Sequence, residues 1–380
     1  MRIALFTDGI QPYVLGGMQR HSFFIAKYLA RSGVQVDLYH YNDSNFDISA
    51  LKVFTDDEKK NINSIVLDFP ASDGLPGHYV RQSYRYSKLL YEEYKKRNSK
   101  VDFIYTKGFT GWHLIERKKK GEQLPPIGVK LHGLNMFQKP PSFRSKIEQY
   151  ILRPPAKFVL KHSDYACSYG GKITETLKNI GIPNSRIIEL PTGIENELVL
   201  KDINPRNEKI RFLYVGRYER LKGVEELGQA LVQLLSSDFD FEMTFIGPIP
   251  DDKRINHSKV QYLGTISDQD KILAEYRAHD VLICPSYSEG MPNVIIEAMS
   301  QGSAIIATNV GAVSALVDNQ NGILIENPEV ELIKSAMLTL AEMDTNEFQN
   351  LKNESLSRIK ETFIWEEITA KLVSELQKRV

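Results

Sequence analysis

The chain has 380 residues, of which 42% are hydrophobic and 25% are charged, and its 48 basic and 48 acidic side chains balance to a formal charge of zero. This length and composition are typical of a soluble protein with two domains. No apolar run is long enough to span a bilayer, which excludes a transmembrane protein. The first residues run directly into a strand-like segment without a signal-peptide pattern, and Cys167 and Cys284 lie in apolar segments. Both features predict a cytoplasmic protein with free thiols.

The formal charge is distributed unevenly along the chain. Residues 1–200 carry 29 Lys and Arg against 20 Asp and Glu, whereas residues 201–380 carry 19 against 28. A basic first half favours an anionic partner, such as a membrane surface or an acceptor with a lipid pyrophosphate. Solvated lysines without a partner explain the excess equally well. No basic and aromatic recognition module is visible, so nucleic acid is not expected as a partner.

The first half alternates strand-like and helical patterns. Residues 17–32 have helical spacing, with Phe24, Tyr28 and Leu29 on one face, and Gly33 ends the helix. A second helix is expected over residues 80–98. Strands are expected over residues 2–8, 34–41, 63–69, 102–108 and 127–133. This alternation predicts a doubly wound parallel sheet.

A basic segment over residues 143–162 follows these strands. It has five Lys and Arg and one Glu, and Phe143, Ile147 and Ile151 fall at helical spacing. Such a segment could lie on a membrane surface, or it could be an ordinary surface helix. The pair Pro154-Pro155 predicts an interruption of the helix.

The alternation starts again in the second half of the chain. The polar stretch 201–209 contains a proline and precedes a strand over residues 209–216, so we expect the domain junction near 195–208. Further strands are expected over residues 242–247, 260–264, 280–286, 304–309 and 322–326, and a last helix over 365–380. We therefore predict an α/β protein with domains over 1–198 and 199–363, and we expect the helix 364–380 to complete the first domain.

The ten residues SEGMPNVIIE (288–297) are the most informative part of the chain. Glu289 and Glu297 stand on either side of a turn in which Pro292 is expected as the first residue of a helix. The free N–H groups at a helix start suit a phosphate, and two carboxylates nearby can accept hydrogen bonds from sugar hydroxyls. The alternative is a pair of surface glutamates beside an ordinary helix start. Strand-like segments at 281–286 and 303–311 favour a nucleotide-sugar pocket.

A second anion-binding candidate lies upstream, in the segment GRYERLKG (216–223). Arg217 and Lys222 follow a strand, open a helix, and should therefore point into the crevice beyond the carboxyl end of that strand. A guanidinium group offers a planar fork to phosphate, and an ammonium group offers a point charge. A solvated loop is the alternative interpretation.

These segments, taken together, resemble the retaining glycosyltransferases of family 4. The resemblance covers nearly the whole chain in the right order: residues 12–36, 131–133, 163–195, 215–223 and 287–311. It implies the GT-B fold, in which two Rossmann-like domains face each other across a donor-binding cleft and the last helix crosses back onto the first domain. It also implies a nucleotide-diphosphate sugar as donor, a saccharide or lipid-linked acceptor, and neither a metal nor another cofactor. The expected location is the cytoplasm, and an anionic membrane is a candidate partner of the basic first domain.

The resemblance assigns a role to each candidate residue. Arg217 and Lys222 would stabilise the leaving diphosphate, Glu289 would contact the donor sugar, and Glu297 would bind the ribose. His132, at the end of the strand 127–133, would contact the donor sugar near the reaction centre. The remaining substrate-binding candidates are Gly16 and Gly17 in the N-terminal loop and Gly290, Met291, Pro292, Asn293 and Val294 at the helix start.

Some positions depart from the family pattern, and other functions stay open. Ala304 stands where the family often has proline, and Ala312 and Ala315 replace a glycine and a glutamate. The alternatives are a sugar-nucleotide epimerase, a phosphorylase, or an inactive partner protein with the same fold. Two Asp-x-Asp patterns, at 238–240 and 268–270, are interpreted as solvated turns, with Ser267 or Asp268 capping a helix.

Overall fold

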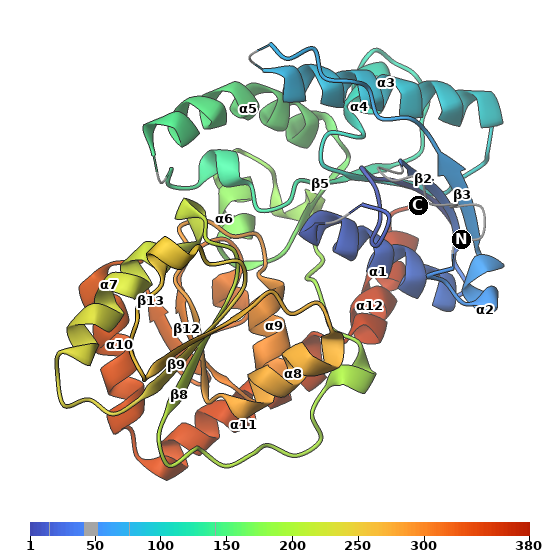
Figure 1. Cartoon of the computed structure of the whole chain (residues 1–380). Helices are drawn as coiled ribbons and strands as arrows, with labels where there is room; N and C mark the ends of the chain where they lie inside the picture. The colour runs from blue at the N-terminus through green and yellow to red at the C-terminus, as the bar shows by residue number, and fades with distance from the viewer. Residues whose placement is uncertain (15, 42–51, 76, 141) are drawn as a thin grey trace. The chain divides into compact units, whose positions relative to one another are not determined.

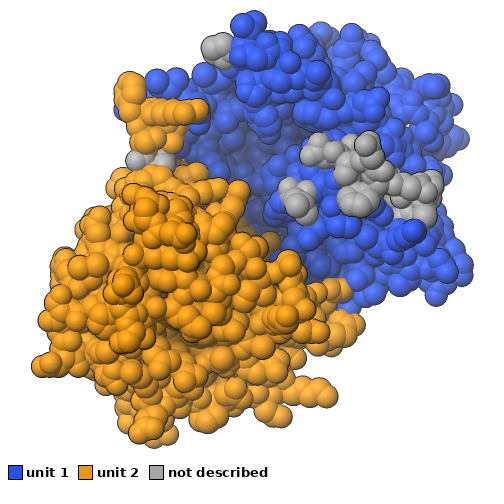
Figure 2. All heavy atoms as spheres, viewed as in Figure 1, with its two compact units in different colours: residues 1–137, 146–192, 365–380 blue, residues 138–145, 193–364 orange. Residues whose placement is uncertain are grey.

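The computed structural model describes residues 1–14, 16–41, 52–75, 77–140 and 142–380 (Figure 1). The chain forms two compact units, which Figure 2 shows in different colours. Unit 1 comprises residues 1–137, 146–192 and 365–380, and unit 2 comprises residues 138–145 and 193–364. The boundary between the units thus falls after Thr192, a few residues before the predicted junction at 198–199, and the last helix belongs to unit 1.

Unit 1 is built on a seven-stranded sheet whose strand pairings are all parallel. The strand order is β3-β2-β1-β4-β5-β6-β7. The chain adds β2 and β3 on one side of β1 and then returns to add β4 to β7 on the opposite side of β1. The strands are β1 (Arg2–Phe6), β2 (Gln35–His40), β3 (Ile62–Val66), β4 (Phe103–Lys107), β5 (Ile127–Lys130), β6 (Tyr165–Ser168) and β7 (Ile187–Glu189). The change of direction between β1 and β4 is a topological switch point, where ligands of such sheets bind.

Helices cover both faces of this sheet (Figure 1). They are α1 (Gly17–Arg31), α2 (Asp56–Lys59), α3 (His78–Arg97), α4 (Trp112–Lys119), α5 (Phe143–His162), α6 (Gly171–Asn179) and α12 (Trp365–Gln377). The helices α1 and α12 share one hydrophobic core, in which the Trp365 ring stacks on Phe24 and Tyr28 with centroids 5.4 and 6.1 Å apart. The last helix is therefore an integral part of the core of unit 1, because Trp365 is fully buried there.

The helix α5 corrects one expectation from the sequence. It runs without a break through Pro154 and Pro155, where an interruption was predicted. Each proline removes one hydrogen bond to the carbonyl group four residues earlier. Those carbonyls belong to Tyr150 and Ile151, whose side chains are exposed, so water can satisfy them. Among the described residues, no helix is long and apolar enough to cross a membrane.

Unit 2 contains a six-stranded parallel sheet with the order β10-β9-β8-β11-β12-β13. Its strands are β8 (Arg211–Val215), β9 (Glu242–Ile246), β10 (Val260–Gly264), β11 (Val281–Cys284), β12 (Ala304–Thr308) and β13 (Gly322–Ile325). The switch point of this sheet lies between β8 and β11. The predicted fold class, two doubly wound α/β units, is confirmed.

The helices of unit 2 are α7 (Val224–Leu235), α8 (Gln269–Ala278), α9 (Asn293–Ser300), α10 (Val330–Glu342) and α11 (Thr345–Thr362). The core on one face joins residues of α7 and α10 to the apolar side chains of β8, β9, β11 and β12. On α11, Lys352 is buried and its Nζ lies 3.4 Å from Asp280 Oδ1, immediately before β11. Asp280 also accepts hydrogen bonds from the backbone N–H groups of Asn207 and Arg211. These contacts tie the entry of β8 and the helix α11 to the start of β11.

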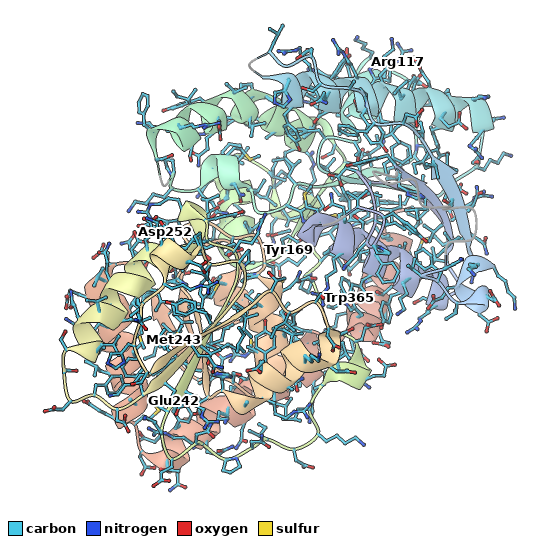
Figure 3. All side chains as sticks on the ribbon, viewed as in Figure 1. Arg117, Tyr169, Glu242, Met243, Asp252 and Trp365 are labelled. Atoms are coloured by element: carbon cyan, nitrogen blue, oxygen red, sulfur yellow. The ribbon has the colours of Figure 1, made fainter. Side chains whose placement is uncertain are left out.

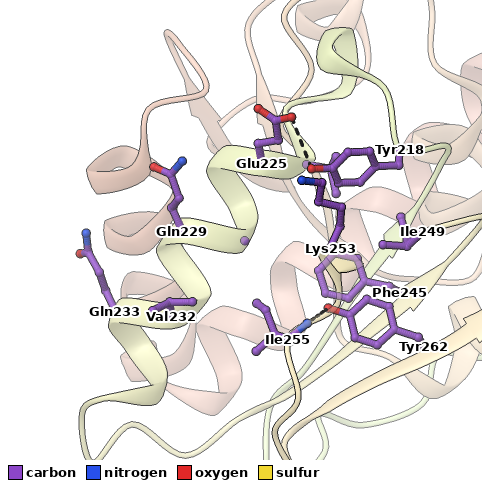
Figure 4. Close-up of a pocket in the computed structure, with 12 residues that line it drawn as sticks. Tyr218, Glu225, Gln229, Val232, Gln233, Phe245, Ile249, Lys253, Ile255 and Tyr262 are labelled. Atoms are coloured by element: carbon purple, nitrogen blue, oxygen red, sulfur yellow. Dashed lines mark hydrogen bonds between the residues drawn. The ribbon is translucent and has the colours of Figure 1, made fainter. Parts of the chain in front are cut away.

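A cavity of about 670 Å³ lies in unit 2 between α7 and residues 249–262 (Figure 4). Its lining includes Phe245 and Tyr262, whose rings stack with centroids 4.8 Å apart. Gly228 of α7 also lines it. None of the candidate residues for nucleotide-sugar binding lines this cavity, so it is separate from the site described next.

Candidate active site

Two loops meet at the switch point of unit 2. One follows β8 and contains the 3₁₀ turn Arg220–Lys222, and the other follows β11 and contains Glu289. The Tyr287 N–H donates to the Leu221 carbonyl across a distance of 2.8 Å. At Gly223, where φ is +65°, an added Cβ would lie only 1.8 Å from the Pro285 carbonyl oxygen. The two loops are therefore locked together, and only glycine permits this close approach.

The close approach brings two candidate residues into direct contact. Lys222 Nζ lies 2.7 Å from Glu289 Oε1, and their side chains are 31% and 10% exposed. The Ser286 hydroxyl donates a second hydrogen bond to the same carboxylate oxygen, also across 2.7 Å. Burial acts to lower the pKa of Lys222, but the attraction of Glu289 outweighs it and leaves the pKa above its ordinary value. The site therefore holds an ammonium charge at neutral pH.

The backbone beside Glu289 is fixed from two further sides. Gln138 Nε2 donates to the Glu289 carbonyl oxygen across 2.7 Å, and the Ala312 N–H donates to the Gly290 carbonyl oxygen across 2.7 Å. A Cβ on Gly311, where φ is +58°, would lie 2.1 Å from the Glu289 carbonyl oxygen. The loop after β12 thus packs directly against the loop after β11. These contacts fix the backbone at Glu289, whose carboxylate is held by Lys222 and Ser286.

The helix α9 begins at Asn293, which corrects the expected start by one residue. Pro292 is the N-cap, with an extended backbone, and it offers no side chain to cap the helix. The start of a helix carries a partial positive charge from its N–H groups, so this position suits an anion. Nearby, the Ser288 hydroxyl is buried and has no hydrogen-bond partner among the described residues.

Glu297 lies in the second turn of α9, among the buried side chains of Ile295, Ile296 and Ala298. The fully buried Tyr276 on α8 donates its hydroxyl to Glu297 Oε2 across 3.0 Å. The sequence predicted that this carboxylate needs a partner but did not identify Tyr276, which lies 21 positions away on another helix.

Arg217 does not join the other candidates in this structure. Its side chain is 72% exposed and pairs with Glu219 across 3.0 Å. Arg217 was expected to open a helix, but it lies before the 3₁₀ turn Arg220–Lys222. Its backbone is nevertheless fixed, because the Tyr214 hydroxyl donates to the Arg217 carbonyl oxygen. The guanidinium group therefore lies on a fixed loop, exposed and paired with Glu219.

The remaining candidates belong to unit 1. Gly16 is the N-cap of α1 and has a φ of 153°, and Gly17 is the first residue of that helix. His132 lies two residues beyond β5, before a tight turn in which the Leu134 N–H donates to the His132 carbonyl oxygen. In that turn Gly133 has a φ of 57°, and Leu134 has a φ of 49°, which is unfavourable for a side chain of this size. Such backbone strain is concentrated at functional sites.

Two buried lysines lie next to His132, and no motif in the sequence pointed to them. Lys107 and Lys130 end the neighbouring strands β4 and β5, pair in register, and are both fully buried. Lys107 Nζ donates to the Met18 carbonyl oxygen and lies 2.8 Å from His21 Nδ1. Lys130 Nζ donates to the Leu190 carbonyl oxygen. Burial lowers the pKa of both lysines well below the ordinary value.

The two Asp-x-Asp patterns have structural roles. Asp268 caps α8 by accepting a hydrogen bond from the Lys271 N–H, as expected for one of the two candidate caps. Asp240 forms ion pairs with Lys209 and Lys259. Within the described ranges, no group of three or more His, Cys, Asp or Glu side chains is arranged to hold a metal ion.

The two doubly wound units, each built on a parallel sheet, define an α/β protein of the GT-B type. A family model for "Glycosyltransferase Family 4" matches residues 15–198, and one for "Glycosyl transferases group 1" matches residues 209–343. The two models together cover most of the chain in the expected order. The chain belongs to the group 1, family 4 glycosyltransferases, which confirms the predicted family.

Individual proteins resemble this chain in sequence or in fold. An uncharacterized glycosyltransferase of Methanocaldococcus jannaschii is 24% identical, and the match covers 100% of this chain and 97% of the relative. A putative teichuronic acid biosynthesis glycosyltransferase of Bacillus subtilis is 30% identical over 44% of each chain. Sucrose-phosphate synthase of Thermosynechococcus elongatus has the same fold, with a TM-score of 0.76 at 19% identity, over 99% of this chain and 98% of the other. HepE of Anabaena, solved with UDP-glucose, has a TM-score of 0.66 at 16% identity over 100% of both chains.

Proposed function

We propose that the protein is a retaining glycosyltransferase that transfers a sugar from a nucleotide diphosphate to a saccharide or lipid-linked acceptor. The observation that carries this proposal is the Lys222–Glu289 contact beside the start of α9. It combines a fixed cation, a fixed carboxylate and a helix start at the switch point of one sheet. A diphosphate is bound by the cation and by the helix start, and a sugar hydroxyl can donate a hydrogen bond to the carboxylate.

Each candidate residue has one task in this reaction. The bond between the anomeric carbon and the diphosphate oxygen breaks, and negative charge grows on the leaving group. Lys222, Arg217 and the backbone N–H groups of Gly290, Met291, Asn293 and Val294 stabilise that charge, so no metal ion is needed. The acceptor oxygen bonds to the same face of the anomeric carbon and passes its proton to the leaving phosphate oxygen. Glu289 and His132 orient the sugar, Glu297 holds the ribose, and Gly16 and Gly17 let backbone approach the ligand.

Similar proteins support this kind of donor and acceptor. HepE of Anabaena was solved with UDP-glucose, which favours a nucleotide sugar as donor, most simply a hexose carried by UDP. The relative from Bacillus subtilis is named for teichuronic acid biosynthesis, which favours an acceptor in surface polysaccharide assembly. The alternative acceptor within the same proposal is a lipid-linked one, which would make the product a glycolipid.

Nucleotide binding can be tested by thermal unfolding against UDP, GDP, ADP and dTDP and their glucose conjugates. A ligand that binds only the folded protein stabilises it, by about 2.7 kcal/mol at one hundred times its Kd. We expect one base to raise the Tm and Glu297→Ala to abolish the shift. Glu331→Ala, which removes an exposed carboxylate on α10, serves as the control. If no nucleotide stabilises the wild type, the proposal is wrong and an inactive partner protein becomes the better description.

We also propose that α5 binds an anionic membrane surface on the cytoplasmic side, where a lipid-linked acceptor would be found. The apolar side chains of Phe143, Ile147, Tyr150 and Ile151 are 77%, 49%, 56% and 45% exposed, at spacings that place them on one face of the helix. Exposed basic side chains adjoin them, at Arg144, Lys146, Lys157 and Lys161. Apolar and basic groups on one helix are the features of interfacial helices.

Sedimentation with vesicles tests this contact. Binding to mixed phosphatidylglycerol and phosphatidylcholine vesicles is expected, with loss in high salt because the charges are screened. Phe143→Ala should weaken binding about tenfold, since burying a large apolar side chain contributes about 1.5–3 kcal/mol. Val232→Ala on α7, which is 54% exposed, should leave binding unchanged. Equal binding of both variants and the wild type would exclude α5 as the membrane contact.

A further inference from the structure

Tyr169 makes a direct contact with His132 that none of the proposed roles uses. Tyr169 follows β6 immediately, is 6% exposed, and its hydroxyl oxygen lies 2.5 Å from His132 Nδ1. The two residues are 37 positions apart and come from loops after neighbouring strands. Figure 3 labels Tyr169 together with Trp365, another residue of this buried region of unit 1.

The side chain of Tyr169 is held in place by its surroundings. Lys130 Nζ lies 3.6 Å from the centre of the Tyr169 ring, and its bond to the Leu190 carbonyl oxygen fixes the lysine in turn. The His21 ring packs edge-on against Tyr169, with centroids 5.6 Å apart. His21 itself is held by Lys107. The phenol ring therefore has no room to turn away from His132.

The direction of the hydrogen bond follows from counting the partners of both groups. Burial raises the pKa of Tyr169 well above its ordinary value, so its hydroxyl keeps its proton. Burial, followed by the nearby lysines, lowers the pKa of His132 well below its ordinary value, so the imidazole is neutral. Tyr169 has no second hydrogen-bond partner among the described residues, so its proton has an acceptor only at Nδ1. A neutral imidazole that accepts at Nδ1 carries its hydrogen on Nε2.

We infer that Tyr169 is a positioning residue that holds His132 as the Nε2–H tautomer, so that His132 meets its substrate as a hydrogen-bond donor and not as a base. His132 Nε2 is buried and has no partner in the described part of the chain. The natural partner for this N–H is a hydroxyl oxygen of the sugar. This second half of the inference rests on the proposed function, whereas the tautomer does not.

The tautomer bears on the reaction class. An inverting transferase needs a protein base to take the proton of the acceptor hydroxyl, and an Nε2 that carries hydrogen cannot accept it. Same-face transfer needs no such base, because the leaving phosphate oxygen takes the proton. The Tyr169–His132 contact thus excludes His132 as the base of an inverting reaction and is compatible with same-face transfer.

Nitrogen NMR of the ligand-free full-length protein tests the tautomer without any assay of activity. Histidine-labelled protein should show the chemical shift of an unprotonated nitrogen at His132 Nδ1 and of a protonated nitrogen at Nε2. Tyr169→Phe should average the two shifts. Tyr105→Phe is the matched control, because the Tyr105 hydroxyl is equally buried but has no partner among the described residues. An unprotonated Nε2 in the wild type overturns the inference, whether or not the protein transfers sugar.

Kinetics test the consequence for the reaction. Tyr169→Phe should lower kcat about tenfold and leave KM nearly unchanged, which corresponds to one lost hydrogen bond in the transition state. His132→Gln keeps an N–H donor but cannot act as a base, so it should be at least tenfold more active than His132→Ala. Equal inactivity of the two His132 variants would show that a base is required and overturn the donor role. If the wild type itself is inactive with every sugar nucleotide, the proposed function fails while the tautomer stands on the NMR result.

Discussion

Lys222→Ala is expected to lower kcat for sugar transfer by about 100- to 1,000-fold, the usual loss when one group that stabilises a developing charge is removed. The ammonium group is fixed by Glu289 at 2.7 Å, so it needs no rearrangement when the diphosphate leaves. Removing it also leaves a carboxylate that is only 10% exposed without its ion partner. Steady-state kinetics with the nucleotide sugar found by thermal unfolding will measure the effect.

Two further variants separate the possible causes of this loss. Lys222→Arg keeps the positive charge and should recover part of the activity. Lys271→Ala removes an exposed cation near the start of α8 and should have no effect. The double variant Lys222→Ala/Glu289→Gln shows whether the unpaired carboxylate adds to the defect. If Lys222→Ala has the kcat of the wild type, Lys222 does not take part in the reaction.

The raised pKa of Lys222 determines the direction in which its contribution to stability changes with pH. Because the folded value lies above the ordinary 10.5, the contribution of this group to stability is fully present below about pH 10.5. It is lost as the pH rises through the folded value. Between pH 7 and 9 the charge of Lys222 should therefore be constant and cause no change in nucleotide affinity.

Gly223→Ala should give the second large effect, a loss of about 3 kcal/mol or more in the stability of unit 2. The new Cβ would lie 1.8 Å from the Pro285 carbonyl oxygen, so the loop after β8 and the loop after β11 would have to separate. That separation would also move Lys222 away from Glu289. Both the Tm and the affinity for the nucleotide should therefore fall.

Two other glycines of unit 2 serve as matched controls. Gly264 has a similar φ of +68°, but nothing lies within 4 Å of an added Cβ, so Gly264→Ala should cost only about 1 kcal/mol. Gly228 lies inside α7 with the same open space, so Gly228→Ala should stabilise the protein by about 0.5–1 kcal/mol. Equal effects at Gly223 and Gly264 would show that the close approach to Pro285 does not matter.

The sequence predicted the fold class because strand and helix patterns alternate through both halves of the chain. It also predicted that Lys222 and Glu289 follow strands, since each comes directly after an apolar run. It could not predict their contact, because they are 67 positions apart and the pairing depends on the order of β8 and β11 in the sheet. The motifs identify the candidate residues, and the order of β8 and β11 in the sheet brings Lys222 and Glu289 together.

The partners that support the candidate residues were beyond prediction for the same reason. Tyr276 and Tyr169 are ordinary aromatic residues in the sequence, and only the packing of α8 and β6 brings them to Glu297 and His132. Lys107 ends an apolar strand, a position where a lysine usually reaches solvent, yet it is fully buried. The predicted break in α5 was wrong because a local rule for proline ignores the solvent exposure of the carbonyls that lose a partner.

The most direct test of the central claim is an NMR experiment on turnover of the nucleotide sugar that stabilises the protein. Proton and phosphorus spectra recorded together follow the released nucleoside diphosphate and the anomeric configuration of the product. We expect diphosphate release with the donor configuration retained in the new glycoside, and release about 100- to 1,000-fold slower with Lys222→Ala. Inversion at the anomeric carbon, or turnover that does not depend on Lys222, would contradict the account.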